Sequence, residues 1–283
     1  MNYFAPLLIV AVGLSVRLRA DVFSFSTGNV DGRIGMASRP SSTGKIEIEA
    51  ADDFLLSSET LIDHATFTGL IPLGVPLSSI ASLNIEIYRT FPNDSANPPS
   101  GNVPTRVSSP SDVAFLTRAS GVPGDLTFGA SVLNGSFTAA NSVLNGIHKI
   151  PNQFTGGEGA VVGQEVSFNV SLTLPIDLPA DHYFFIPQVQ LVTGEFYWLS
   201  SVRPLVSPGT PFAPDLQAWI RDENLDPDWL RVGTDIVGGS PVPTFNGAFT
   251  VSGETVPEAS TVVAGAMLGL CAIAARKRSR EIK

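Results

Sequence analysis

The stretch that decides the fold is 166-VSFNVSLTL-174, the clearest strand-type alternation in the chain. Val166, Phe168, Val170, Leu172 and Leu174 are apolar, and the residues between them are serine, asparagine, serine and threonine. Successive side chains of a β-strand point to opposite faces, so this stretch predicts a strand with one face on a core and the other in water.

The same alternation recurs on both sides of this stretch. Ile46 and Ile48 alternate with charged residues. Leu83, Ile85 and Ile87 alternate with polar residues. Further strands are expected over 21–26, 62–70, 113–117, 126–132, 182–192, 196–201, 230–233 and 245–252, with turn-forming residues between them.

Helical spacing is not sustained over three turns anywhere in the middle of the chain, and its best short example is Leu216–Arg221, at most a turn or two. The segment 92–110 has few apolar residues, and alternation resumes after it, which predicts a loop rather than a domain linker. We therefore expect an all-β fold, an antiparallel β-sandwich of jelly-roll or another Greek-key order.

Apolar runs at both ends divide the 283 residues into three parts: 1–20, 21–255 and 256–283. The middle part holds 24 acidic and 10 basic residues, a net charge of −14 that argues against nucleic acid as a partner. The single cysteine, Cys271, lies in the last part, so residues 21–255 contain no disulfide, cysteine nucleophile or thiolate metal site.

The first part is typical of a signal peptide. Phe4–Val16 is an apolar run of the right length to form a signal helix, and Arg17, Leu18, Arg19 and Ala20 follow it. We expect cleavage after Ala20, with 11–13 as a less favoured alternative, and export of everything up to Val256.

The last part joins a Pro-Glu motif, an apolar run and a basic end. Thr261–Ala275 has no charge and would form a helix of roughly 22 Å, short of the ~30 Å hydrocarbon core of a bilayer. The positive-inside rule keeps the basic end cytoplasmic; it consists of Arg276, Lys277, Arg278 and Arg280.

This order of segments resembles the PEP-CTERM sorting signal of exported bacterial proteins, over about 28 residues. The recognition motif maps to Pro257, Glu258, Ala259 and Ser260, where alanine replaces the usual second proline. The resemblance implies that a membrane-embedded exosortase recognises the tail and cleaves it near this motif. The alternative is a plain C-terminal membrane anchor.

The middle part is also similar to uncharacterised exported proteins that carry the same kind of tail. The resemblance rests on IYRTFPNDS (87–95), ADHYFFIPQVQL (180–191) and DPDWLRVGTDIVGG (226–239). It implies a shared sandwich and brings no catalytic residue.

Acidic residues are densest in one segment near the end of the middle part. Loop carboxylates of this kind can bind calcium, but the order of an EF-hand loop is missing, so solvated turn acids paired with Arg221 and Arg231 are the favoured interpretation. We expect the other acidic pair, Asp52-Asp53, to cap a turn at the entrance of a strand. The dense segment contains Asp222, Glu223, Asp226, Asp228 and Asp235.

The remaining candidate residues point to no enzyme. Exposed tryptophans would form a sugar-binding platform, but burial in a core is favoured for Trp198, Trp219 and Trp229. His64 and His182 each follow an aspartate, and neighbours in a strand point to opposite faces, so we expect no acid–base pairs there. The chain has no G-x-S-x-G motif.

The sequence thus predicts an exported envelope or extracellular-matrix protein with a non-catalytic structural or adhesive domain and no metal or cofactor. Its expected partners are an exosortase, the membrane through Thr261–Ala275, and matrix polysaccharide. Two alternatives stay open: a carbohydrate-binding module with exposed tryptophans, and an extracellular polysaccharide hydrolase or lyase with acids that converge in a cleft.

Overall fold

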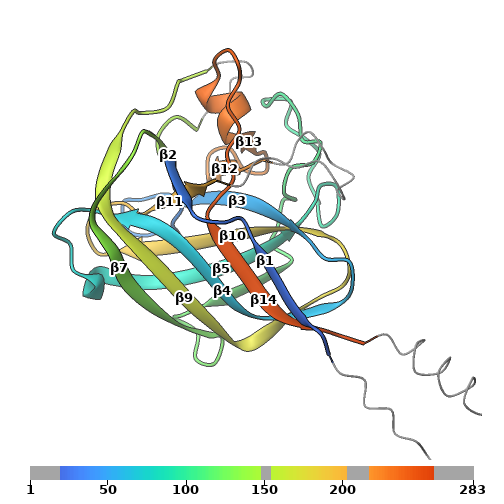
Figure 1. Ribbon diagram of the computed structural model, residues 1–283. Coiled ribbons are helices and arrows are strands. Elements are labelled where there is room, and N and C mark those ends of the chain that lie inside the picture. Colours follow the sequence, from blue (N-terminus) through green and yellow to red (C-terminus); the bar gives the residue numbers. More distant parts are fainter. Residues whose placement is uncertain (1–19, 148–153, 203–216, 258–283) are drawn as a thin grey trace, which may run out of the picture. The chain divides into compact units, whose positions relative to one another are not determined.

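The computed structural model describes residues 20–147, 154–202 and 217–257, in which fourteen strands and two short helical turns lie (Figure 1). The strands of the first half are β1 (Val22–Ser26), β2 (Val30–Ala37), β3 (Ile48–Leu55), β4 (Thr60–Ile71), β5 (Ile80–Arg89), β6 (Leu116–Ala119) and β7 (Leu126–Ala139). Those of the second half are β8 (Asn141–Val143), β9 (Val161–Leu178), β10 (His182–Leu191), β11 (Tyr197–Ser201), β12 (Trp219–Asp222), β13 (Leu230–Arg231) and β14 (Phe249–Thr255). The turns are a 3-10 helix, η1 (Leu77–Ser79), and a π-helix, η2 (Val232–Val237).

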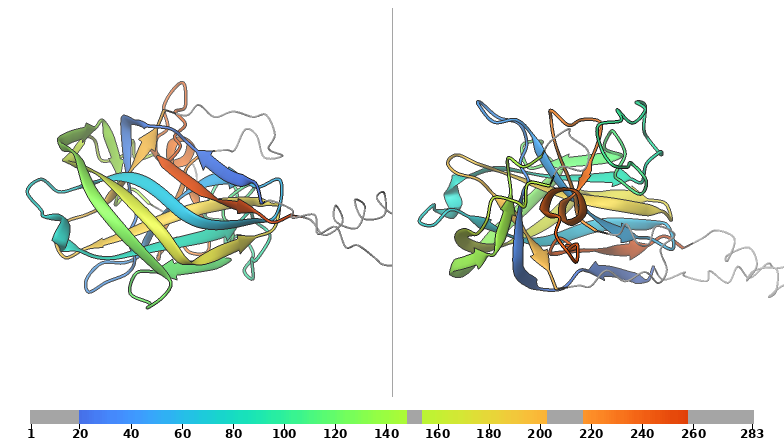
Figure 2. Two further views of the ribbon diagram at one scale, coloured as in Figure 1. Left: turned by 60° about the horizontal axis from the view of Figure 1, so that its bottom comes forward. Right: turned by 90° about the horizontal axis from the view of Figure 1, so that it is seen from above.

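The larger of the two sheets has eight strands and is organised around β4. On one side β4 pairs with β9, which pairs with β7; on the other side it pairs with β14 and then with β11. Strand β14 continues to β1, and β11 continues to β2 and β8. Figures 1 and 2 show β7, β9, β4, β14 and β1 running side by side.

The smaller sheet has six strands in the order β13-β12-β3-β10-β5-β6, all antiparallel. Its long central strand, β10, is buried along almost its whole length because one of its faces meets the core and the other is covered by loops. This covered outer face carries the candidate functional site.

One continuous hydrophobic core contains buried residues of both sheets and is rich in phenylalanine. The ring of Phe185 on β10 stacks on Phe249 of β14, with ring centroids 4.9 Å apart. Phe67 of β4 lies 6.3 Å from Phe185 and stacks on Phe168 of β9. Aromatic rings at these distances attract each other beyond the area they bury, so these contacts tie the two sheets together.

The alternation in 166–174 predicts β9 correctly up to Leu172. Val166, Phe168 and Val170 are fully buried, and the residues between them are not. Leu174 departs from the pattern: it is 53 % exposed because the register against β4 shifts after Ser171, and burial resumes only at Ile176.

Three expectations about the elements are wrong. The short helical stretch expected at Leu216–Arg221 is wrong in its described part, since Trp219 to Asp222 form β12 between β3 and β13. The larger sheet is mixed rather than antiparallel, because β2 and β8 pair in parallel. Strand β2 was not predicted at all, because its sequence does not alternate: Ile34 to Ala37 are all buried, whereas Val30 to Arg33 are partly or largely exposed. The predicted loop at 92–110 is confirmed.

Only the edges of the two terminal segments belong to the described residues. Ala20, the expected cleavage site, lies two residues before β1, and Pro257 lies two residues after β14. The rest of the sorting motif, the apolar run and the basic end lie outside the described residues. In the described part of the chain, no helix is long and apolar enough to cross a membrane.

Candidate functional site

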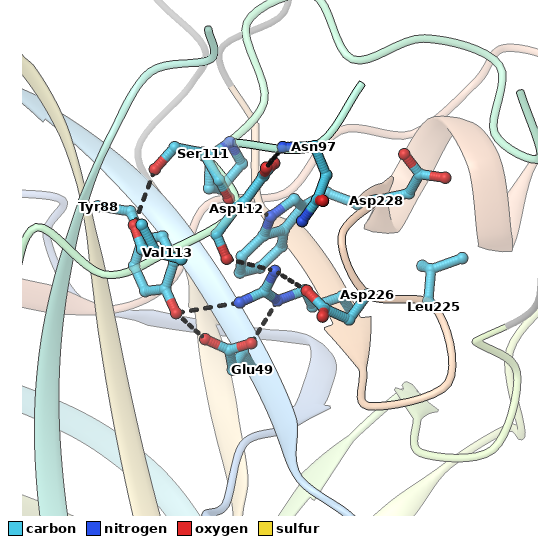
Figure 3. Close-up of polar contacts among 12 residues, drawn as sticks. Glu49, Tyr88, Asn97, Ser111, Asp112, Val113, Leu225, Asp226 and Asp228 are labelled. Atoms are coloured by element: carbon cyan, nitrogen blue, oxygen red, sulfur yellow. Dashed lines mark hydrogen bonds and ion pairs between the residues drawn. The ribbon is translucent and has the colours of Figure 1, made fainter. Parts of the chain in front are cut away.

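The candidate site is a buried polar cluster on the outer face of the smaller sheet, centred on Arg221 of β12 (Figure 3). Arg221 Nε donates to Glu49 Oε2, on the neighbouring strand β3, and Nη2 donates to the hydroxyl of Tyr88 at 3.0 Å. Its Nη1 donates to Asp226 Oδ1 at 2.7 Å and to the main-chain oxygen of Asp112 at 3.0 Å. Each nitrogen of the guanidinium therefore has a partner.

The site closes through Tyr88 and Trp229. The Tyr88 hydroxyl donates to Glu49 Oε1 at 2.6 Å, so both carboxylate oxygens of Glu49 are bonded and the residue is only 4 % exposed. The Arg221 guanidinium lies 4.5 Å from the ring centre of Trp229, which packs edge-on against Tyr88. Burial raises the pKa of Tyr88, so its hydroxyl stays a neutral donor.

A second arginine extends the cluster into the loop at 91–115. Arg106 pairs with Asp112 at 3.1 Å and with Asp228 at 3.3 Å, and all three side chains are about as buried as core residues. The guanidinium of Arg106 also covers the ring of Phe91 at 4.6 Å. Asp228 in turn accepts from the hydroxyl of Ser100. The two arginines therefore fasten two loops to the sheet.

Glu86 on β5 is a further acid next to the cluster. Its Oε2 lies 3.3 Å from the Tyr88 oxygen. Burial and the negative charge of Glu49 raise the pKa of Glu86 to about 8, and Glu47 adds to the effect. Burial also raises the pKa of Glu47. At neutral pH Glu86 is therefore a neutral carboxyl group that can donate a hydrogen bond.

This titration predicts a pH-dependent stability. Between the ordinary pKa of 4.5 and about 8, folded Glu86 keeps a proton that the unfolded chain has released, so the free energy of unfolding falls as pH rises. In the variant Glu86→Gln this fall should be smaller, and its advantage over the wild type should grow from pH 5 to pH 8. Urea unfolding at both pH values measures this. Glu59→Gln, at an exposed position, is the control, and an equal slope in all three proteins would contradict the assignment.

The structure separates most of the acids of the dense segment. Asp226 pairs with Arg221 and Asp235 with Arg231, as predicted, but Asp228 and Asp235 are buried rather than solvated. Asp222 accepts from main-chain NH groups two and three residues ahead, as a turn cap. Over the described residues, no group of three or more histidines, cysteines or acids could hold a metal ion.

Asp52 and Asp53 lie inside β3 and do not cap a turn at its entrance. Asp52 Oδ2 accepts from the main-chain NH of Gly247 at 3.0 Å. Asp53 contacts Nε2 of His182 at 2.9 Å, because the two residues lie on the paired strands β3 and β10. The sequence did not reveal this histidine–acid pair, whose members are 129 residues apart.

The prediction that His64 forms no pair with the neighbouring aspartate is wrong. His64 Nδ1 lies 2.8 Å from Oδ1 of its neighbour Asp63, although neighbours in a regular strand point apart. The register of β4 shifts between Ile62 and His64, so the local alternation is broken and both side chains reach the same exposed region.

The three tryptophans are fully buried, as favoured from the sequence. Trp198 lies in the core between the sheets and donates to the main-chain oxygen of Ala248 at 3.0 Å. Trp219 and Trp229 lie under the loops on the outer face of the smaller sheet. None of them offers a ring face to a sugar. No family model, curated protein or solved structure matches this chain.

The chemistry of the cluster is therefore that of a closed ion network. A catalytic carboxylate must reach its substrate, whereas Glu49 has both oxygens bonded inside the protein. Sequence reasoning found Arg221 and Arg231 as partners of nearby acids. It missed Glu49, Tyr88, Glu86 and Arg106. Glu49 and Glu86 occupy the polar positions of alternating strands, and Arg106 lies in the predicted loop, so no sequence signal sets these residues apart.

Proposed function

We propose that the protein is an exported bacterial envelope or extracellular-matrix protein that is sorted by an exosortase and carries a non-catalytic structural or adhesive domain. The observation that carries the proposal is the order of segments at the C-terminal end: Pro257-Glu258, the uncharged run Thr261–Ala275, and four basic residues after it. The apolar run Phe4–Val16 fits the same membrane topology, in which the middle part is exported and the basic end stays in the cytoplasm.

In this proposal the domain is a β-sandwich of jelly-roll or another Greek-key order. Support comes from the aromatic contacts between β10 and the strands β4 and β14, since side chains from two facing sheets interdigitate in a sandwich. The buried acids support a structural role. Glu49 pairs with Arg221, and Asp112 and Asp228 pair with Arg106, so these carboxylates stabilise the packing of the loops on the sheet. The terminal segments form the signal helix and the single apolar helix.

The test is the intact mass and the location of the protein in a host with and without an exosortase. With the enzyme we expect the mass to fall by the residues beyond the Pro257 region and the protein to leave the membrane fraction. The double substitution Pro257→Ala and Glu258→Ala should reduce this processing at least tenfold, and Glu254→Ala, three residues earlier, should not. A tail that persists in both hosts would show a simple anchor.

A further inference from the structure

Strand β7 leaves one of its two edges unpaired over most of its length. It has 14 residues and pairs with β9 on one side, at the margin of the larger sheet (Figure 1). Its end approaches β2, where the NH of Ala140 donates to the main-chain oxygen of Gly32 at 2.8 Å. Over 126–136, no strand of the described residues other than β9 pairs with β7. Main-chain NH and C=O groups of this stretch therefore face solvent in a row, as at any open sheet edge.

The usual protections of a sheet edge are largely missing from β7. The other edge strands of the two sheets, β1, β8, β6 and β13, have only two to five residues. β7 is long, and residues 126–147 contain no charged residue and no proline. Proteins normally prevent an edge from pairing with another chain by shortening it, charging it, or adding proline or a bulge. The register against β9 shifts only after Val132, so residues 126–132 form a regular, unprotected edge.

The core face of this edge is incompletely covered. Phe128 and Ala130 are only partly buried where they pack against the hydrophobic core, and Val132 is 43 % exposed. On the opposite face, Thr127 and Ser131 are exposed. An additional strand at this edge would cover apolar surface and bond the free main-chain groups at the same time.

We propose that the β7 edge pairs with the β7 edge of a second copy of this chain, antiparallel and about a two-fold axis at Gly129. Gly129 is the centre of the regular stretch, so this register pairs all of 126–132. It places Phe128 opposite Ala130 of the copy and Val132 opposite Leu126 of the copy, so that apolar residues meet on the core face. A two-fold contact uses the same surface on both copies and closes as a dimer.

The charge of the domain favours a copy at this edge and an antiparallel arrangement. Residues 21–255 carry a net charge of −14, so two copies repel each other wherever their acids meet. The uncharged edge avoids this repulsion, and it offers no charge that would attract an acidic or basic partner. The nearest acid in sequence is Asp125, and the antiparallel register puts the Asp125 side chains of the two copies at opposite ends of the pair.

This inference goes beyond the proposed function because it gives the domain a partner, namely itself. Self-association of this kind suits a structural or adhesive matrix protein, since each contact links two molecules. It concerns only β7 and does not depend on whether an exosortase processes the tail.

The test is sedimentation equilibrium of the purified full-length chain in a non-ionic detergent, with two double variants. Thr127→Glu with Ser131→Glu makes the edge negative, and Thr127→Lys with Ser131→Lys makes it positive; both positions are exposed, so the fold should persist. We expect the wild type to form a dimer that dissociates on dilution. In the proposed register residue 127 faces residue 131 of the copy, so each variant alone should raise the dimer dissociation constant about tenfold or more. An equimolar mixture of the two variants should restore the dimer, because opposite charges then meet.

The matched control is the double variant Asn169→Glu with Thr173→Glu. It adds the same charges at the same spacing to exposed positions of β9, whose two edges are both paired, and it should dimerise like the wild type. A wild-type chain that stays monomeric up to about 0.1 mM would overturn the proposal. So would equal dimerisation of all variants, equal loss in the β9 control, or a mixture that stays monomeric. The tail is the same in every variant and its processing is not measured, so these outcomes are distinguishable from a failure of the sorting proposal.

Discussion

The variant Arg221→Met should lose about 3–5 kcal/mol of unfolding free energy, the usual cost of removing one partner from a buried ion pair. The loss arises because the Glu49 carboxylate would be left at 4 % exposure with only the Tyr88 hydroxyl as hydrogen-bond donor. Asp226 contributes less, since its side chain is 55 % exposed and can be solvated. Urea unfolding followed by tryptophan fluorescence measures the effect, because Trp229 lies against the guanidinium.

Two controls separate the ion pair from a general effect of losing an arginine. Arg118→Met removes a guanidinium that donates to main-chain oxygens at exposed positions, and it should cost less than about 1 kcal/mol. Glu49→Gln should cost less in the Arg221→Met background than in the wild type, because the unpaired charge is then gone. If Arg221→Met and Arg118→Met are equally stable, the network does not fasten the loops as described.

Sequence alternation predicts those strands that have one wet face. Strands β5 and β9 belong to this group, and the expected core residues are buried except for Leu174 at the end of the β9 pattern: Leu83, Ile85, Ile87, Val166, Phe168, Val170 and Leu172. Strand β12 (WIRD) and the second half of β2 (Ile34–Ala37) are covered on both faces, so these sequences do not alternate and both strands were missed. The loss of alternation at Leu174 has a different cause, a register shift between two long strands, which depends on the partner strand.

The candidate site could be predicted only where its partners are near in sequence. Asp226 and Asp235 lie five and four residues from their arginines, and both pairs were expected. Glu49 is 172 residues from Arg221, and Tyr88 is 133 residues away, so only the sheet order β12-β3-β10-β5 brings them together.

Loss of the ring at Phe185 should destabilise the protein as strongly as loss of Arg221, but through the core. Phe185 is fully buried on β10, and its ring meets Phe249, Trp198 and Phe67, which all belong to the other sheet. Phe185→Ala should therefore cost about 3–5 kcal/mol, from lost burial and from the cavity that remains. Phe185→Leu should cost clearly less, because it refills much of the volume.

The matched control for this prediction is Phe154→Ala, the same chemical change at a residue that is 56 % exposed. It should change the free energy of unfolding by about 0.5 kcal/mol or less. Urea unfolding measures all three variants, and near-ultraviolet circular dichroism reports the packing around Trp198, whose indole borders the Phe185 ring. Equal losses in Phe185→Ala and Phe154→Ala would mean that β10 does not join the two sheets through this ring. If only Phe185→Ala loses stability and the tryptophan signal changes, the contacts of the Phe185 ring hold the two sheets together. These contacts lie on the core face of β10, and the other face of this strand is covered by loops.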